Sequence, residues 1–141
     1  EYSKKIEIRW ADLDPNFHVL HSKYYDFGAY CRMSFFTEHG ITTALMIEEN
    51  IGPIIFREEC LFKREIKFGD ELEVFLKLSK CREDASRWSM RHELWINRDA
   101  LAAVITLDGA WIDTRIRKLA KPPVICKTGF DLIPKTENFN Q

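Results

Sequence analysis

Carboxylate, amide and imidazole side chains are concentrated in one short stretch of the chain. Asp12, Asp14 and Asn16 alternate along it, and His18 and His21 follow. The stretch contains a proline and an asparagine, which are typical of irregular structure, and it directly precedes a long segment with helical spacing. Side chains of these types can bind a metal ion, structure a loop, or act as acids, bases or nucleophiles.

Two metal-binding interpretations are weak. A calcium-binding EF-hand loop would begin D-x-D-x-N, as this stretch does, but it would then need a glycine where the chain has Phe17 and a glutamate where it has Lys23. A zinc site made of Asp14, His18 and His21 would lack a fourth ligand, and no H-E-x-x-H motif supports it. We therefore expect no metal and no cofactor.

Two other interpretations stay open. In the first, the aspartates and the asparagine cap turns and the histidines are solvated. In the second, a carboxylate placed just before a helix lies beside unpaired backbone N–H groups. Those groups can hold an oxyanion while the carboxylate attacks a carbonyl or activates a water molecule, which suits acyl transfer.

The stretch must be positioned by the elements on either side of it. Before it, Ile6, Ile8 and Trp10 alternate with charged residues, which predicts a half-buried strand. After it, a helix is predicted over Ser22–His39, with Ser22 as its N-cap and Gly40 just beyond its end.

The predicted helix is apolar around most of its circumference, so we expect other parts of the protein to surround it. Arg32 interrupts its apolar side and requires a buried partner or a route to solvent. The polar residues fall on one narrow stripe: Lys23, Asp26, Tyr30, Ser34 and Thr37.

Beyond Pro53 the spacing is that of strands joined by short turns, which predicts antiparallel neighbours. The fold class is therefore α+β, with a curved antiparallel sheet of about five strands wrapped around the long central helix. Residues 124–141 show little periodicity and are expected to form an irregular C-terminal extension that packs through Phe130 and Leu132.

Length and composition limit the possible classes of protein. The 141 residues suit one domain, and a formal net charge of -1 argues against a nucleic-acid partner. The most apolar run, Leu101–Leu107, is too short to span a membrane. Four scattered cysteines without a C-x-x-C motif predict reduced thiols and a cytoplasmic protein.

Several short motifs together resemble one known family. The segment Asp12-Leu13-Asp14-Pro15, followed by His21, Tyr24-Tyr25 and Arg32, is similar to the hotdog-fold acyl-CoA thioesterases of the 4-hydroxybenzoyl-CoA thioesterase type. The similarity includes residues 62–70 (FKREIKFGD) and 111–123, and so covers roughly residues 6–123. It implies a hotdog thioesterase domain over residues 1–123 that hydrolyses an acyl-CoA to a carboxylic acid and free coenzyme A.

The resemblance also implies roles for individual residues. Asp14 would be the catalytic nucleophile or general base, and His21 would lie near the thioester. Backbone N–H groups at the start of the helix would hold the oxyanion, and Asp12 would structure the loop. The expected substrate-binding residues are Tyr24 and Tyr25 for the acyl group and Lys63 and Arg64 for the phosphates of coenzyme A.

The chain departs from the family pattern at two places. The family usually has glycine where this chain has Asn16 and Phe17, which predicts a different path for the loop. It often has glutamate two residues after the helical arginine, where this chain has Ser34.

Other functions and the state of assembly follow from the same features. The alternative function is that of a non-catalytic hotdog module that binds an acyl group or acts as an assembly unit. A hotdog dehydratase is not supported, because the sequence lacks the histidine–acid pattern of that family. Open edge strands and the apolar segment Leu101–Leu107 predict a homodimer or homotetramer, and the resemblance implies an active site shared between subunits.

Overall fold

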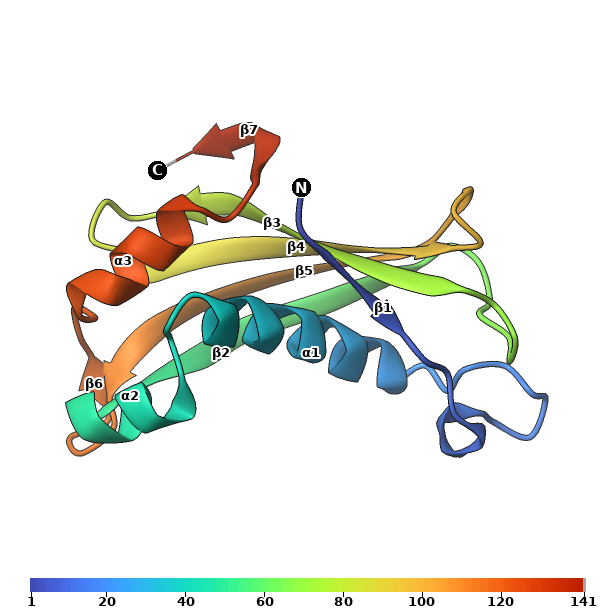
Figure 1. Cartoon of the computed structure of the whole chain (residues 1–141), viewed down its shortest axis with the longest axis horizontal. Helices are drawn as coiled ribbons and strands as arrows, with labels where there is room; N and C mark the ends of the chain where they lie inside the picture. Colours follow the sequence, from blue (N-terminus) through green and yellow to red (C-terminus); the bar gives the residue numbers. More distant parts are fainter. Residues whose placement is uncertain (141) are drawn as a thin grey trace.

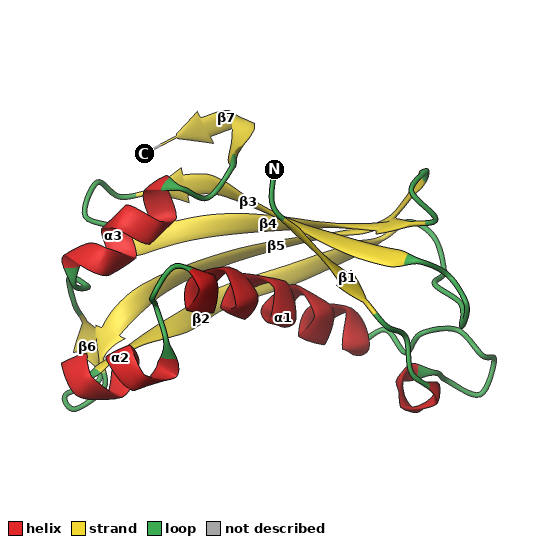
Figure 2. Cartoon of the chain, in the orientation of Figure 1, coloured by secondary structure: helices red, strands yellow, loops and turns green. Residues whose placement is uncertain are grey.

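A curved sheet wraps around one long helix (Figures 1 and 2). The computed structural model describes residues 1–140, with Asn140 described by its backbone alone. In chain order the elements are β1 (Ser3–Ile6), the 3-10 helix η1 (Trp10–Asp12), α1 (Lys23–Glu38), α2 (Thr43–Glu49), β2 (Ile51–Phe62), β3 (Leu72–Cys81), β4 (Arg87–Ile96), β5 (Ala100–Asp113), β6 (Lys118–Leu119), α3 (Val124–Asp131) and β7 (Lys135–Asn140).

The strands follow the order β1-β3-β4-β5-β2 across the sheet, and neighbours along this path are antiparallel. The short β6 pairs with β5, and β7 runs parallel to β3. A curved antiparallel sheet around a long helix is the α+β architecture that the sequence predicts, so that prediction is confirmed.

Helix α1 is one residue shorter at each end than predicted. Ser22 occupies the N-cap position, as predicted, but its backbone angles are helical and its side chain makes no capping hydrogen bond. The C-terminal prediction is confirmed, because Gly40 takes a left-handed φ of 81°. The Ile41 amide then donates to the carbonyl of Phe36 at 2.8 Å and the Gly40 amide to that of Thr37 at 3.2 Å, which closes the helix.

The inner side of α1 fills the concave side of the sheet. Its buried residues include Phe27, Cys31, Phe35 and Phe36, which join one core with the inward side chains of the strands. The helix remains exposed along part of the predicted polar stripe, including Tyr30. Figure 1 shows the helix lying along the concave side of the sheet, so within one chain the sheet covers its inner side and does not enclose it.

The strand predicted up to Trp10 ends four residues earlier, at Ile6. The Arg9 side chain binds the Asp12 carboxylate, with Nη2 2.8 Å from Oδ1, and draws the chain into the turn η1. The alternation therefore continues in sequence but not in the sheet, and the Trp10 side chain is exposed.

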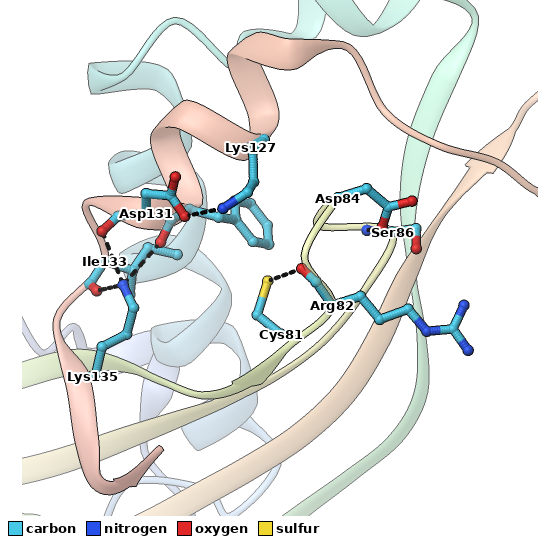
Figure 3. A network of polar contacts seen from close by, with 9 residues as sticks. Cys81, Arg82, Asp84, Ser86, Lys127, Asp131, Ile133 and Lys135 are labelled. Atoms are coloured by element: carbon cyan, nitrogen blue, oxygen red, sulfur yellow. Dashed lines mark hydrogen bonds and ion pairs between the residues drawn. The ribbon is translucent and has the colours of Figure 1, made fainter. Parts of the chain in front are cut away.

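The segment after Pro123 is not irregular, which corrects the prediction. Helix α3 places Phe130 in the core, whereas Leu132, also expected to pack, is exposed. Figure 3 shows why the turn after α3 holds: Lys135 Nζ donates to the carbonyl oxygens of Phe130, Asp131 and Ile133. Pro122, Pro123 and Pro134 bracket this short helix, so the segment shows little local periodicity in the sequence.

Strand β2 leaves one long edge of the sheet open. On the opposite side, β1 and β7 together cover most of the outer edge of β3. Pro53 lies within β2, a position that proline tolerates on an edge strand. Exposed apolar side chains follow the strand: Ile55, Phe56, Leu61 and Phe62.

We predict that the chain forms at least a homodimer through the open edge of β2, because the edge combines unpaired backbone groups with apolar side chains. Light scattering at micromolar concentration should give at least twice the mass of 16.7 kDa. The Leu61→Glu variant should shift the mass toward the monomer. Leu132→Glu, which changes a similarly exposed residue just after α3, should not. A monomeric wild type would contradict the prediction.

Candidate active site

The loop between η1 and α1 folds into a small hairpin with Asp14 at its base. Leu13 and Val19 form an antiparallel bridge, and the Asp14 amide donates to the carbonyl of His18 at 2.8 Å. The Asp14 carboxylate accepts through Oδ1 from the amides of Asn16 at 2.8 Å and His18 at 3.2 Å. Its Oδ1 thus structures the loop, whereas Oδ2 accepts no hydrogen bond from residues 1–140.

Asp12 structures the loop, as predicted. Its side chain is buried, and it accepts from the Arg9 backbone N–H at 3.0 Å as well as from the Arg9 side chain. The hydrogen bonds from Arg9 lower the pKa of Asp12 below its usual range. The amide of Leu20 donates to the Asp12 carbonyl at 2.8 Å, so Asp12 ties the beginning of the loop to its end.

A third segment is attached to this hairpin. The Val19 amide donates to the carbonyl of Ile66 at 2.7 Å, and His18 forms a bridge with Lys67. The His18 imidazole also lies 3.0 Å from a carboxylate oxygen of Glu65. The tertiary structure therefore brings the backbone of the 63–70 segment against the Asp14 loop.

The predicted phosphate-binding residues lie at the start of that segment. The amides of Lys63 and Arg64 both donate to the carbonyl of Ala102, at 2.8 and 3.0 Å, and their side chains are exposed. They stand on the segment that reaches Asp14, but their side chains make no contact with Asp14 among the described residues.

The start of α1 differs from what an oxyanion hole at its first residues requires. The amides of Lys23 and Tyr24 donate to the carbonyls of Leu20 and His21, at 2.9 and 3.3 Å. Within residues 1–140 the amides of His21 and Ser22 donate to no acceptor. The hypothesis that backbone N–H groups hold an oxyanion therefore moves from the helix to these two residues just before it.

The remaining predicted residues fall into two environments. The His21 side chain is exposed. Tyr24 is buried, and its ring meets Phe62 edge-on with the ring centroids 4.9 Å apart. Burial raises the pKa of Tyr24, so its hydroxyl stays neutral. Its ring packs in the core next to the end of β2. Tyr25 is half-buried.

Phe17 adopts a backbone conformation that favours glycine. Its φ is 65°, in the left-handed region, where a bulky residue carries a strain of roughly 1–2 kcal/mol. Its amide donates to the Asp14 carbonyl at 2.9 Å and closes the turn. The departure from glycine is thus accommodated by a strained phenylalanine.

A buried polar cluster, which the sequence analysis did not identify as a site, joins α1 to the sheet. Arg32 Nη1 lies 3.0 Å from His92 Nε2 and 3.7 Å from a Glu58 carboxylate oxygen, and His92 Nδ1 lies 3.0 Å from the carbonyl of Phe75. Arginine only donates, so Nε2 accepts and His92 is the neutral Nδ1–H tautomer. Two features of the sequence point to this cluster: the charge of Arg32 on an apolar side of the helix, and the position of His92 among the inward-facing residues of its strand.

The other reactive side chains do not form a site. Burial raises the pKa of Cys31 to about 12 and those of Cys60, Cys81 and Cys126 to about 11, and all four thiols are unpaired. They are therefore protonated at neutral pH and poor nucleophiles. Residues 1–140 hold no group of three or more His, Cys, Asp or Glu side chains arranged for a metal ion. No described helix is long and apolar enough to cross a membrane.

Comparison with known proteins defines the fold. A family model described as the thioesterase-like superfamily matches residues 8–128. A hypothetical protein of Staphylococcus aureus solved in complex with CoA has a TM-score of 0.87 at 16% identity, covering 96% of this chain and 87% of that one. No curated protein sequence matches the chain.

Two further structures carry functional names. A 1,4-dihydroxy-2-naphthoyl-CoA thioesterase of Synechocystis has a TM-score of 0.83 at 17% identity, covering 93% of this chain and 96% of that one. A gentisyl-coenzyme A thioesterase has a TM-score of 0.78 at 19% identity, covering 91% and 98%. At these identities the likeness shows the hotdog fold, which confirms the predicted fold class.

The buried state of His92 predicts how stability depends on pH. Burial, together with the Arg32 charge, lowers the pKa of His92 to about 3, against 6.5 ordinarily. The unfolded chain therefore binds the extra proton first, so the contribution of neutral His92 is complete above pH 6.5 and is lost as the pH falls toward 3.

Between pH 7 and pH 5 the free energy of unfolding of the wild type should fall by about 2 kcal/mol more than that of His92→Gln, which keeps an acceptor but does not titrate. Urea unfolding at both pH values measures the difference. Parallel pH profiles for the two proteins would show that His92 is not held neutral.

Proposed function

The chain belongs to the thioesterase-like superfamily, and from this we propose that it hydrolyses acyl-CoA thioesters to a carboxylic acid and free coenzyme A. The observation that carries the proposal is Asp14, whose carboxylate is fixed at the base of a tight hairpin directly before α1 and keeps one oxygen free of protein hydrogen bonds. The resemblance to the 4-hydroxybenzoyl-CoA thioesterase type and the names of two structural neighbours support coenzyme A thioesters as the substrate class.

Asp14 acts on the thioester carbonyl by one of two routes. As a nucleophile, its Oδ2 attacks the carbonyl carbon, the C–S bond breaks, and the coenzyme A thiolate leaves and takes a proton from solvent. Water then hydrolyses the resulting mixed anhydride. As a general base, Asp14 takes a proton from a water molecule that attacks the same carbon, the C–S bond breaks, and the coenzyme A thiolate leaves and takes up that proton. Only the first route can place oxygen-18 from labelled water in the Asp14 side chain, when water attacks the aspartyl carbon of the anhydride.

The groups around Asp14 supply the other requirements of the reaction. The amides of His21 and Ser22 are available to donate to the oxyanion that forms on the thioester carbonyl. The exposed His21 imidazole orients the carbonyl or the attacking water. Tyr24 and Tyr25 border the acyl group, and Lys63 and Arg64 attract the phosphates of coenzyme A.

The active unit is proposed to be a dimer or tetramer. Tyr24 packs on Phe62, whose ring is half exposed on the open edge strand β2. A second copy against this edge would cover the side of the site that a single chain leaves open. Four unpaired cysteines are consistent with a reducing compartment such as the cytoplasm.

Asp14→Asn should reduce the rate of acyl-CoA hydrolysis by about 10²–10⁴-fold while the melting temperature stays close to that of the wild type. Asparagine keeps an Oδ1 that accepts from the same two amides, but it cannot attack or take a proton. A release assay for the free thiol over a panel of aromatic, short and long acyl-CoA substrates, run beside thermal unfolding, measures both effects.

Asp12→Asn is the matched control. It removes the buried negative charge that pairs with Arg9 and should therefore lower the melting temperature, whereas the turnover per folded molecule should change far less than in Asp14→Asn. Normal turnover of folded Asp14→Asn would exclude Asp14 as the catalytic group. A wild type inactive on every thioester would favour the acyl-binding module.

His21→Ala should lower kcat by about tenfold or more and leave the melting temperature unchanged, because the exposed imidazole contributes to the reaction and not to packing. The same thiol-release assay and thermal unfolding test this. His18→Ala serves as the comparison, since His18 faces Glu65 and should affect the loop more than the chemistry. An unchanged kcat for His21→Ala would show that His21 is a solvated side chain with no role in the reaction.

A further inference from the structure

We propose that an exposed aromatic cluster beside the Asp14 loop is the platform for the adenine ring of coenzyme A, with the neighbouring cations holding its phosphates. The cluster consists of Trp10, Phe17 and Phe68. The proposal rests on the proposed function, because it assigns a subsite to the same substrate.

The three rings of the cluster lie on the surface and not in the core. Trp10, Phe17 and Phe68 are 67%, 62% and 50% exposed. Trp10 stacks on Phe68 with the ring centroids 5.2 Å apart at 28°, and the edge of Phe17 lies 6.2 Å from Trp10. The Phe68 ring covers part of one face of the Trp10 indole, and most of the indole surface remains exposed to solvent. Phe17 also holds its place in a strained left-handed conformation.

Three cations stand on the segment that carries Phe68. Lys63, Arg64 and Lys67 are exposed, and none of them pairs with a carboxylate of the described residues. Glu65, which lies between them in sequence, is engaged by His18. The segment thus presents an excess of positive charge next to exposed aromatic rings.

The cluster and the cations are attached to the Asp14 loop by backbone contacts. Phe17 closes the turn that begins at Asp14, and Trp10 accepts through its carbonyl from the Leu13 amide at 3.2 Å. The bridge between His18 and Lys67 fixes the cationic segment to the same hairpin. A ligand seated on the cluster is therefore bound at the rim of the proposed active site.

The chemistry of the surface fits a purine that carries phosphates. Stacking on aromatic side chains is how proteins bind bases without reading their edges, and lysine and arginine are the usual partners of phosphate. The three rings offer on the order of 300–400 Å² of surface, which is enough for one base. A stable interface with a second copy needs about 800 Å² per partner, so the cluster alone is too small for that role.

The test compares two thioesters of the same acyl group, one of coenzyme A and one of N-acetylcysteamine, which lacks the nucleotide. Trp10→Ala should raise KM for the acyl-CoA by about five- to 150-fold, the range expected for loss of one stacked base, with kcat nearly unchanged. Hydrolysis of the N-acetylcysteamine thioester should be the same in both proteins. Trp10→Phe should restore part of the affinity.

Tyr30→Ala is the matched control, because it removes an exposed ring of α1 that is not part of the cluster, and it should change KM for neither thioester. Direct binding is measured by quenching of tryptophan fluorescence with adenosine 3′,5′-bisphosphate, which should occur in the wild type and be lost in Trp10→Phe. This readout reports on the platform even if no thioester is hydrolysed, so failure of the activity and failure of the subsite are separate results.

Three results would overturn the proposal. The first is an unchanged KM for acyl-CoA in folded Trp10→Ala. The second is an equal loss with both thioesters, which would place the ring against the reacting group or the loop. The third is sedimentation with anionic phosphatidylserine vesicles that depends on Trp10 without quenching by the bisphosphate, which would assign the cluster to a lipid surface.

Discussion

The hydrogen bond between Arg32 and His92 holds the central helix against the middle of the sheet. A guanidinium buried in an apolar core costs several kcal/mol unless it finds an acceptor. His92 provides one because the carbonyl of Phe75 accepts its Nδ1–H and burial keeps the ring neutral. Gly28 allows the approach, since a Cβ at that position would lie 3.0 Å from His92 Cδ2. The depth of α1 in the sheet thus depends on Arg32, His92 and Gly28.

Once the helix is fixed, its N-terminal end fixes the loop that enters it. Asp12 joins the loop to Arg9 on one side, and Val19 donates to Ile66 on the other. Asp14 is therefore held by backbone on both flanks although it lies in irregular structure. A carboxylate held in this way has little conformational freedom left to lose, which the catalytic role proposed for Asp14 requires.

The two ends of the chain complete the sheet on one side and leave it open on the other. The N-terminal β1 and the C-terminal β7 share the outer edge of β3, and α3 covers the core through Phe130. The long β2 has no such cover, and it carries Glu58, whose buried Oε2 accepts no hydrogen bond from the described residues. The side of the molecule next to β2 is the one that a partner or a ligand would complete.

The sequence by itself determined the elements whose spacing is local. Alternation predicted the strands, the apolar residues within 22–39 predicted a helix packed against the core, and Gly40 predicted its end. The cluster of polar residues before the helix also identified the loop that holds Asp14. These features depend on neighbours within a few positions, so a linear pattern contains them.

Only the tertiary structure decided which distant residues meet. His92 looked like one more inward strand position until Arg32 was placed beside it, 60 residues away in the chain. The Arg9–Asp12 contact ended β1 before Trp10 despite the continuing alternation, and packing against the core made α3 from a proline-rich tail. Burial, pairing between distant segments and the positive φ of Phe17 arise from the closed chain, and no local pattern encodes them.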